Sequence, residues 1–137
     1  MRLIGLLLFA GLVFADGPSF QPVAGVGQIM SGLIQPSAAA VSAAAKTPPQ
    51  DDQAWRKAER DSAMLAEGGN LLMIGDRAKD QEGWMKDARA LVDAAAAVNK
   101  AAHDKDAPAY TAAAANVGAT CQGCHATYRQ RRGGKRN

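Results

Sequence analysis

The sequence predicts an all-α protein, an antiparallel up-down-up-down four-helix bundle formed by one domain. Aromatic residues make up only 5% of the 137 residues, and alanine is concentrated in the runs 38–45, 94–97 and 112–115. Such runs favour helices that approach one another closely, because β-strands prefer branched and aromatic side chains. Four segments also carry apolar residues at helical spacing, and mostly short links join them, as in an antiparallel bundle.

The first predicted helix starts at Pro22, because the missing N–H of a proline costs nothing in a first helical turn. Its apolar stripe is Val23, Val26, Met30 and Leu33. Pro36 predicts a kink, since its ring meets the carbonyl group of Gly32 and its nitrogen donates no hydrogen bond. Residues 46–49 end this helix.

The second predicted helix has Asp51 or Asp52 as its N-cap and ends at the segment Gly68-Gly69-Asn70. Its buried stripe is Trp55, Ala58, Ser62 and Leu65. The connection that follows, residues 71–82, is longer than most bundle loops. It contains Leu71, Leu72, Met73 and Ile74, so we expect it to pack over the bundle.

The third and fourth predicted helices have regular stripes and are joined by a short turn around residues 104–108. The third stripe is Trp84, Ala88, Leu91, Ala95, Val98 and Ala102. The fourth is Tyr110, Ala113, Val117, Cys121, Cys124 and Tyr128. Both follow the alternating spacing of three and four residues that places side chains on one helix face.

The N-terminus has the features of a secretory signal peptide. Arg2 precedes an apolar run from Leu3 to Phe14, and this run is too short to span a membrane comfortably. Cleavage near Ala15 would leave a mature domain of residues 16–130 and a basic tail of residues 131–137. We therefore expect an exported, periplasmic protein without stable membrane insertion.

The basic character of the chain comes from its C-terminal end. The net charge is +3, and removal of Arg2 leaves 15 basic and 13 acidic residues. Five of the basic residues lie near the end of the chain: Arg129, Arg131, Arg132, Lys135 and Arg136. Because no aromatic residues interleave with these charges, the sequence does not favour nucleic-acid binding.

The segment Cys121-Gln122-Gly123-Cys124-His125 holds both cysteines and one of the two histidines. The pattern C-x-x-C-H is typical of covalent haem c attachment, with two cysteine thioethers and a histidine ligand to iron. On a helix, residues three and four apart share a face, so the two thiols and His125 can reach one porphyrin. A thioredoxin-like dithiol would expect a βαβ setting, and a zinc site would find only His103 as a further imidazole.

The four-helix pattern with this motif near the end of the last helix, followed by Ala126-Thr127-Tyr128-Arg129, resembles the class II c-type cytochromes, the cytochrome c′ superfamily. Further likeness lies in Gln28-Ile29-Met30, in Leu65-Ala66-Glu67 through Asn70-Leu71-Leu72, in Arg77 and in Trp84-Met85. The stretches from Leu65 onward, with Arg77 and Trp84-Met85, resemble a bacterial branch of the superfamily. The resemblance implies one haem c, bound through Cys121 and Cys124, with His125 as the proximal iron ligand.

In such families the residue facing the iron opposite the histidine decides the function. An apolar residue leaves iron five-coordinate and open to NO or CO, whereas a methionine gives low-spin iron suited to electron transfer. In an antiparallel bundle Met30 lies at about the level of His125, which makes it the expected sixth ligand. Met64 and Met73 are the rivals, Met85 is less favourably placed, and methionine is otherwise a common core filler.

The sequence thus predicts a Met-ligated, low-spin monohaem cytochrome that transfers single electrons and is not an enzyme. The alternative is a five-coordinate protein that binds NO or CO. A peroxidase would require a distal His/Arg pair, which we do not find. Arg77 or Arg129 could pair with a haem propionate, Tyr128 could pack on the porphyrin, and His103 is expected at the surface. The redox partner is not identified, and the resemblance leaves a homodimer open.

Overall fold

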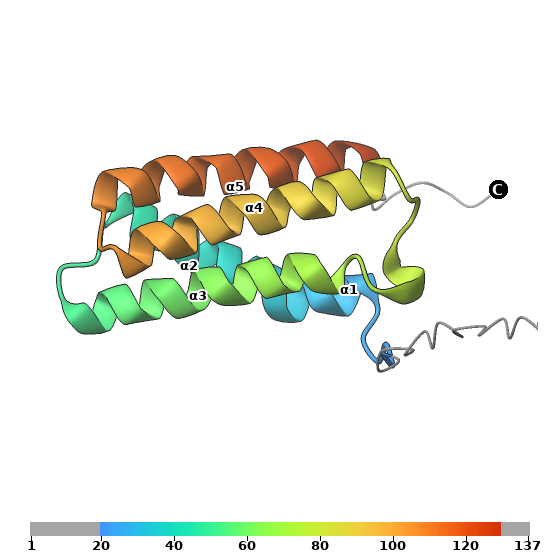
Figure 1. The fold of residues 1–137 in the computed structure, drawn as a ribbon, viewed down its shortest axis with the longest axis horizontal. Helices are drawn as coiled ribbons and strands as arrows, with labels where there is room; N and C mark the ends of the chain where they lie inside the picture. The colour runs from blue at the N-terminus through green and yellow to red at the C-terminus, as the bar shows by residue number, and fades with distance from the viewer. Residues whose placement is uncertain (1–19, 130–137) are drawn as a thin grey trace, which may run out of the picture.

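The computed structural model describes residues 20–129, which form a four-helix bundle without strands in that range. The first helical stretch is continuous and comprises α1 (Val26–Ile29), the π-helical segment η1 (Met30–Ile34) and α2 (Gln35–Lys46). It is followed by α3 (Asp52–Leu71), the 3₁₀ turn η2 (Gly75–Arg77), α4 (Gly83–His103) and α5 (Ala107–Tyr128). Successive helices run in opposite directions, which confirms the predicted architecture (Figure 1).

The core consists largely of the predicted stripes. In α3 and α4 every predicted stripe residue is buried, from Trp55 and Leu65 to Trp84 and Val98. In α5 the stripe is buried at Tyr110, Ala113 and Val117 and only half-buried from Cys121 onward. The packed core therefore gives way to a partly open region at the end of α5.

The predicted start of the first helix at Pro22 is wrong. The helix begins at Val26, Gly25 is its N-cap, and the Gly25 N–H donates to the Gln28 side chain over 3.0 Å. Val23 lies before the helix and is 91% exposed, so it is not part of the core stripe. A side-chain acceptor for the first free N–H is available at Gly25 and not at Pro22, which explains the later start.

The predicted end of the second helix at residues 68–70 is also wrong, because α3 continues through both glycines to Leu71. A Cβ atom on Gly68 would lie 2.6 Å from Cγ1 of Ile34, and one on Gly69 would lie 2.8 Å from Cγ2 of Val92. These glycines therefore permit close helix packing on two sides of α3 instead of ending it. The free energy gained from close packing at these two positions therefore exceeds the cost of placing glycine inside a helix.

The disturbance predicted at Pro36 takes the form of a π-turn one turn earlier. The Gln35 N–H donates to the carbonyl oxygen of Met30, five residues back. Pro36 cannot donate to the carbonyl group of Gly32, so the helix accommodates it by this wider turn. Ile29 and Ile34, five residues apart, are both 4% exposed.

The loop between α3 and α4 packs on the bundle as predicted. Leu72 is buried, and its carbonyl oxygen accepts a 2.8 Å hydrogen bond from the Trp84 indole. Arg77 is buried and donates to the carbonyl oxygens of Ala24 (3.0 Å) and Leu71 (3.1 Å). The guanidinium group thus fixes the loop to the segment before α1.

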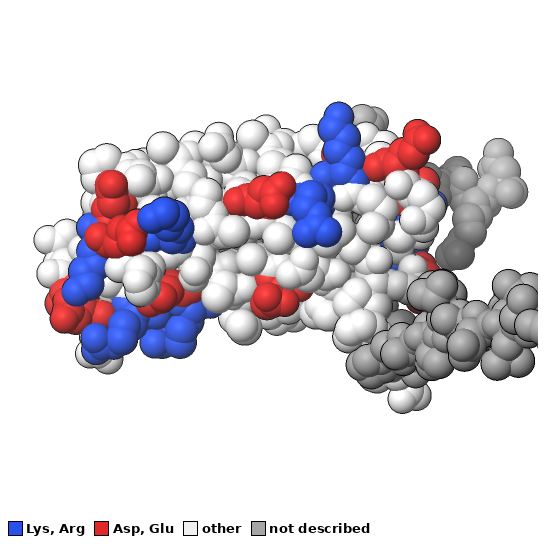
Figure 2. All heavy atoms as spheres, viewed as in Figure 1, with Lys and Arg blue, Asp and Glu red and all other residues white. Residues whose placement is uncertain are grey.

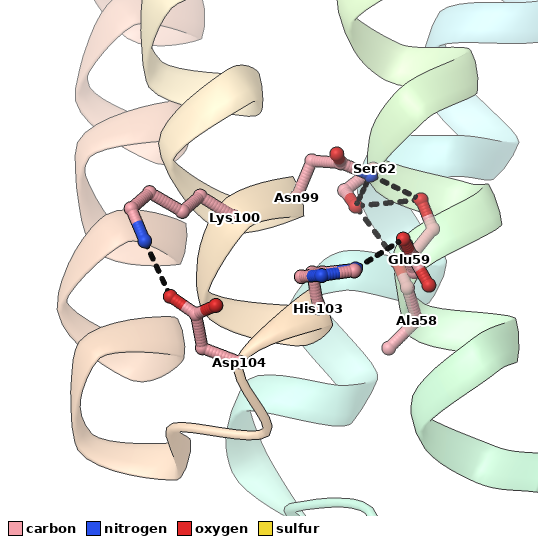
Figure 3. Close-up of polar contacts among 7 residues, drawn as sticks. All are labelled: Ala58, Glu59, Ser62, Asn99, Lys100, His103 and Asp104. Carbon is pink, nitrogen blue, oxygen red and sulfur yellow. Dashed lines mark hydrogen bonds and ion pairs between the residues drawn. The ribbon is translucent and has the colours of Figure 1, made fainter. Parts of the chain in front are cut away.

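A polar layer joins α3 to α4 near the other end of the bundle (Figure 3). The Asn99 amide donates to the Glu59 carbonyl oxygen over 2.7 Å, and Ser62 Oγ lies 3.3 Å from the same amide nitrogen. His103 Nδ1 lies 3.1 Å from Glu59 Oε1, with the imidazole largely exposed as predicted. These contacts fix α3 relative to α4 at the end of the bundle that lies opposite the partly open region around the end of α5.

The face shown in Figure 2 mixes basic and acidic side chains over α3 and α4. The face seen in this view is therefore of mixed charge and is not a continuous basic surface. Within residues 20–129 no helix combines the length and apolarity needed to cross a membrane. The predicted signal peptide and the tail of residues 131–137 lie outside the described residues.

Candidate functional site

A cavity of about 680 Å³ opens at the end of the bundle where the first helical stretch, the start of α4 and the end of α5 meet. Clefts that hold cofactors and other small molecules typically measure about 300–1,000 Å³. The apolar side chains that line the cavity include Val26, Ile34, Ala38 and Trp84. A small hollow of about 40 Å³, lined in part by Leu72, Ala88 and Leu91, lies against several of the same residues.

Cys121, Cys124 and His125 all line this cavity from the last turns of α5. Both thiols are free and half-buried, and His125 is exposed. Burial raises the pKa of each thiol, and the nearby Asp87 carboxylate raises the pKa of Cys124 further. The two thiols therefore stay protonated at neutral pH and do not resemble the activated thiolate of a redox dithiol.

Met30 lines the same cavity and the smaller hollow, and so does Ile34 one turn later. The rival Met64 is 46% exposed, and Met73 and Met85 are half-buried against the core. None of these three lines either space. The structure therefore brings only Met30 among them together with His125.

Trp84 and Tyr128 form an aromatic wall of the cavity. Their rings meet edge to face, with centroids 5.1 Å apart and planes at 81°. The Tyr128 hydroxyl donates to Asp80 Oδ2 over 2.5 Å. A Cβ on Gly83 would lie 2.5 Å from this hydroxyl, so glycine at position 83 leaves room for the tyrosine.

Lys79 and Arg129 are the charged side chains that line the cavity, and both are exposed. Of the two arginines that the sequence offered as partners of a haem propionate, only Arg129 lines the cavity. Arg77 does not line this cavity and is committed to two backbone carbonyls. The sequence did not single out Lys79, because a lone loop lysine has no signal until the fold brings it to the cavity.

Residues 20–129 contain no group of three or more His, Cys, Asp or Glu side chains arranged to hold a metal ion. The zinc interpretation of the Cys121–Cys124 pair would need such a group in addition to the two thiols. The pair stands instead beside an apolar cavity.

A comparison with known families finds a match over the end of the chain that carries the motif. Residues 76–129 match the family model described as Cytochrome C'. The match covers η2, α4 and α5, and so includes both cysteines and His125. This part of the chain is therefore similar to the Cytochrome C' family, and the similarity points to covalent binding of haem c. Neither a curated protein nor a solved structure matched the chain.

The residues that line the cavity fit a haem group. Two free thiols stand one helical turn apart at its edge, and an imidazole follows directly on the same helix. Apolar and aromatic side chains supply most of the remaining lining, and the two exposed cations, Lys79 and Arg129, could serve as charge partners for the carboxylates of a porphyrin.

Proposed function

We propose that this protein transfers single electrons in the periplasm through one six-coordinate haem c. Cys121 and Cys124 would hold the group by thioether bonds, and His125 and Met30 would be its axial ligands. The observation that carries the proposal is the shared cavity, which Met30 lines from η1 and His125 lines from α5. When bound, haem supplies a one-electron redox centre, and Met/His ligation raises its potential.

Each residue has a distinct task in this proposal. The covalent bonds to α5 keep the group in place through repeated changes of charge, and His125 fixes the iron relative to the same helix. Met30 fills the position that an external ligand would otherwise take. Trp84 and Tyr128 exclude water from one side, which lowers the local dielectric constant around the redox centre.

A second candidate function is the binding of NO or CO at a five-coordinate iron. The match to the Cytochrome C' family favours it, because proteins of that family typically leave the sixth position open. In that case Met30 would be an apolar lining residue without a bond to iron. The two candidates therefore differ at one side chain.

The deciding experiment is an optical spectrum of the holoprotein expressed with its own leader and the host haem-attachment machinery. A six-coordinate electron-transfer protein should show sharp α and β bands when reduced. It should also show the weak ferric charge-transfer band of a methionine–iron bond, and it should bind little CO. A high-spin spectrum with rapid CO binding would establish the second candidate instead.

Substitution of the methionine tests the ligand directly. Met30→Ala should convert the protein to a high-spin form that binds CO, because alanine offers no donor atom to iron. Met64→Ala is the matched control, since Met64 is exposed and does not line the cavity. A low-spin spectrum unchanged by Met30→Ala would show that Met30 is not the ligand and would leave Met73 as the rival to test by the same substitution.

A further inference from the structure

The π-turn at residues 30–34 lies in the same segment as the proposed iron ligand. Met30 is its first residue, and the Met30 carbonyl oxygen accepts the N–H of Gln35, five residues later. A π-turn takes up one residue more than an α-turn and is often found at functional sites. The position of this turn therefore affects where the Met30 side chain lies.

Burial shows that the turn determines which residues face the interior. In an uninterrupted α-helix, residues five apart point about 140° away from each other, at about 100° per residue. Ile29 and Ile34 are five apart and both 4% exposed, so the wider turn places them on one face. Ile34 also occupies the space that a Cβ on Gly68 would fill, so α3 is shaped to receive the widened segment.

Pro36 gives the turn a covalent cause. In an α-helix its ring would meet the carbonyl group of Gly32, and the hydrogen bond to that group would be missing. The Ser31 hydroxyl, within the widened turn, donates to the Gly27 carbonyl oxygen over 3.0 Å and so supplies a further donor to the preceding turn. Pro36 itself is exposed and does not line the cavity.

We propose that Pro36, through the π-turn, is a positioning residue that sets the coordination state of the iron by aiming Met30 into the cavity. Relaxation of the turn to α-helix would rotate the residues before it by about 100° relative to α2 and shift them by about 1.5 Å. Met30 would then leave the position that faces His125. The proposal rests on the electron-transfer function proposed above, in which Met30 binds iron.

The test compares Met30→Ala, Pro36→Ala and Pro36→Ala with Gly32 deleted, each as holoprotein. Pro36→Ala should lose the low-spin bands and gain CO binding to the level of Met30→Ala, although Met30 is still present. Deletion of Gly32 removes the extra residue and returns the two halves of the helix to phase, so it should restore the low-spin spectrum. Gly32 is exposed, and no atom lies within 4 Å of its Cβ position.

Two controls separate this effect from loss of stability. Pro108→Ala changes a proline in the first turn of α5, where no N–H is needed, and should leave the spectrum unchanged. In the reduced holoprotein, with CO added to the variants that bind it so that the iron is low-spin and diamagnetic in every sample, nuclear Overhauser contacts between residues 30 and 35 report the π-turn independently of the Met30 ligand. These contacts should be present in the parent protein and absent in Pro36→Ala.

The possible failures are distinguishable. If Met30→Ala remains low-spin, the proposed iron ligand is wrong. If Met30→Ala opens the iron but Pro36→Ala does not, packing of Ile29 and Ile34 alone holds the turn and the role of Pro36 is refuted. If Pro36→Ala opens the iron and the Gly32 deletion fails to restore it, rotation of Met30 is not the cause. Should Pro36→Ala fail to fold, Gly68→Ala perturbs the same turn from α3, and an unchanged spectrum there would count against the proposal.

Discussion

The hydroxyl group of Tyr128 donates a 2.5 Å hydrogen bond to Oδ2 of Asp80, 48 residues earlier. The other oxygen of Asp80 accepts the N–H groups of Glu82 (3.0 Å) and Trp84 (3.1 Å) at the start of α4. One carboxylate therefore joins the end of α5 to the beginning of α4. Since Cys124 and His125 lie one turn or less before Tyr128, this contact holds the attachment segment against the cavity.

The first prediction concerns the pH dependence of this contact. The Tyr128 hydroxyl holds the pKa of Asp80 below its ordinary value of 3.8, and the bond to Asp80 raises the pKa of Tyr128 to about 12. A lowered carboxyl pKa stabilises the fold above pH 3.8, and a raised phenol pKa stabilises it below pH 10. Tyr128→Phe should therefore lower the unfolding temperature between these limits.

The difference between the parent and Tyr128→Phe should decline as the pH falls below 3.8, where the unfolded chain takes up the Asp80 proton before the folded chain does. It should also decline from pH 10 to about pH 12, where the unfolded chain has lost the phenol proton and the folded chain has not. Thermal unfolding followed by circular dichroism across this range is the measurement. A constant difference at all pH values would show that ring packing on Trp84, and not the hydrogen bond, is what the variant disturbs.

The second prediction concerns the buried glycines of α3. Gly68→Ala would force its Cβ to within 2.6 Å of Ile34, and overpacking of this kind costs about 1–3 kcal/mol. The gain in helix propensity, about 1 kcal/mol, offsets only part of this cost. We expect a net loss of about 1 kcal/mol in the free energy of unfolding, measured with denaturant.

Gly118→Ala is the matched control, because nothing lies within 4 Å of that Cβ position on α5. It should stabilise the protein by up to about 1 kcal/mol through helix propensity alone. If both substitutions stabilised the protein, Ile34 would have enough freedom to move, and close packing would not explain why α3 continues through its glycines.

Helix number, direction and core positions could be predicted from sequence because they depend on local periodicity. The stripes from Trp55 to Leu65 and from Trp84 to Ala102 are buried as their spacing requires. The same local reasoning placed Cys121, Cys124 and His125 on one helix face, and the structure brings all three to one cavity.

The errors arose where distant contacts outweigh local preference. Gly68 and Gly69 have the chemistry of a helix end, but their neighbours Ile34 and Val92 come from other helices and make small residues necessary inside α3. Pro36 predicted a disturbance but not its form, since the local sequence does not show that Ile29 and Ile34, five residues apart, would both be buried. Lys79 gained significance only when the loop was placed beside the cavity.

The third prediction concerns the Tyr110 hydroxyl, a buried polar atom without a hydrogen-bond partner among the described residues. The ring packs edge to face on Trp55 with centroids 6.0 Å apart, and burial raises the pKa of Tyr110 to about 12. Tyr110→Phe keeps this ring contact and removes an unpaired group whose burial costs about 1–3 kcal/mol.

We therefore expect Tyr110→Phe to leave the free energy of unfolding unchanged or to raise it by about 1 kcal/mol. Tyr110→Leu is a useful comparison, because it also removes the edge-to-face contact with Trp55 and should be destabilising. A clear loss of stability in Tyr110→Phe would reveal a partner for the hydroxyl, such as a buried water molecule.

The fourth prediction concerns the charge of Lys79 at the cavity. A cation close to the proposed redox centre favours the reduced state, which carries one more electron, so Lys79→Gln should lower the reduction potential. Lys79 is exposed, and an exposed charge contributes at most about 1 kcal/mol, which for one electron is about 40 mV. The shift should shrink as salt is added, because charges separated by about 10 Å are largely screened at 0.1 M ionic strength.

Potentiometric titration of the holoprotein at low and high salt measures this effect. Lys46→Gln is the control, because Lys46 lies in the last turn of α2 and does not line the cavity. The reduction potential of this variant should equal that of the parent. An Arg129→Gln variant should lower the potential in the same direction, because Arg129 is the other cation of the cavity lining. Equal shifts in the Lys46 and Lys79 variants would mean that the potential responds to net charge alone, and Lys79 would then have no specific place beside the redox centre.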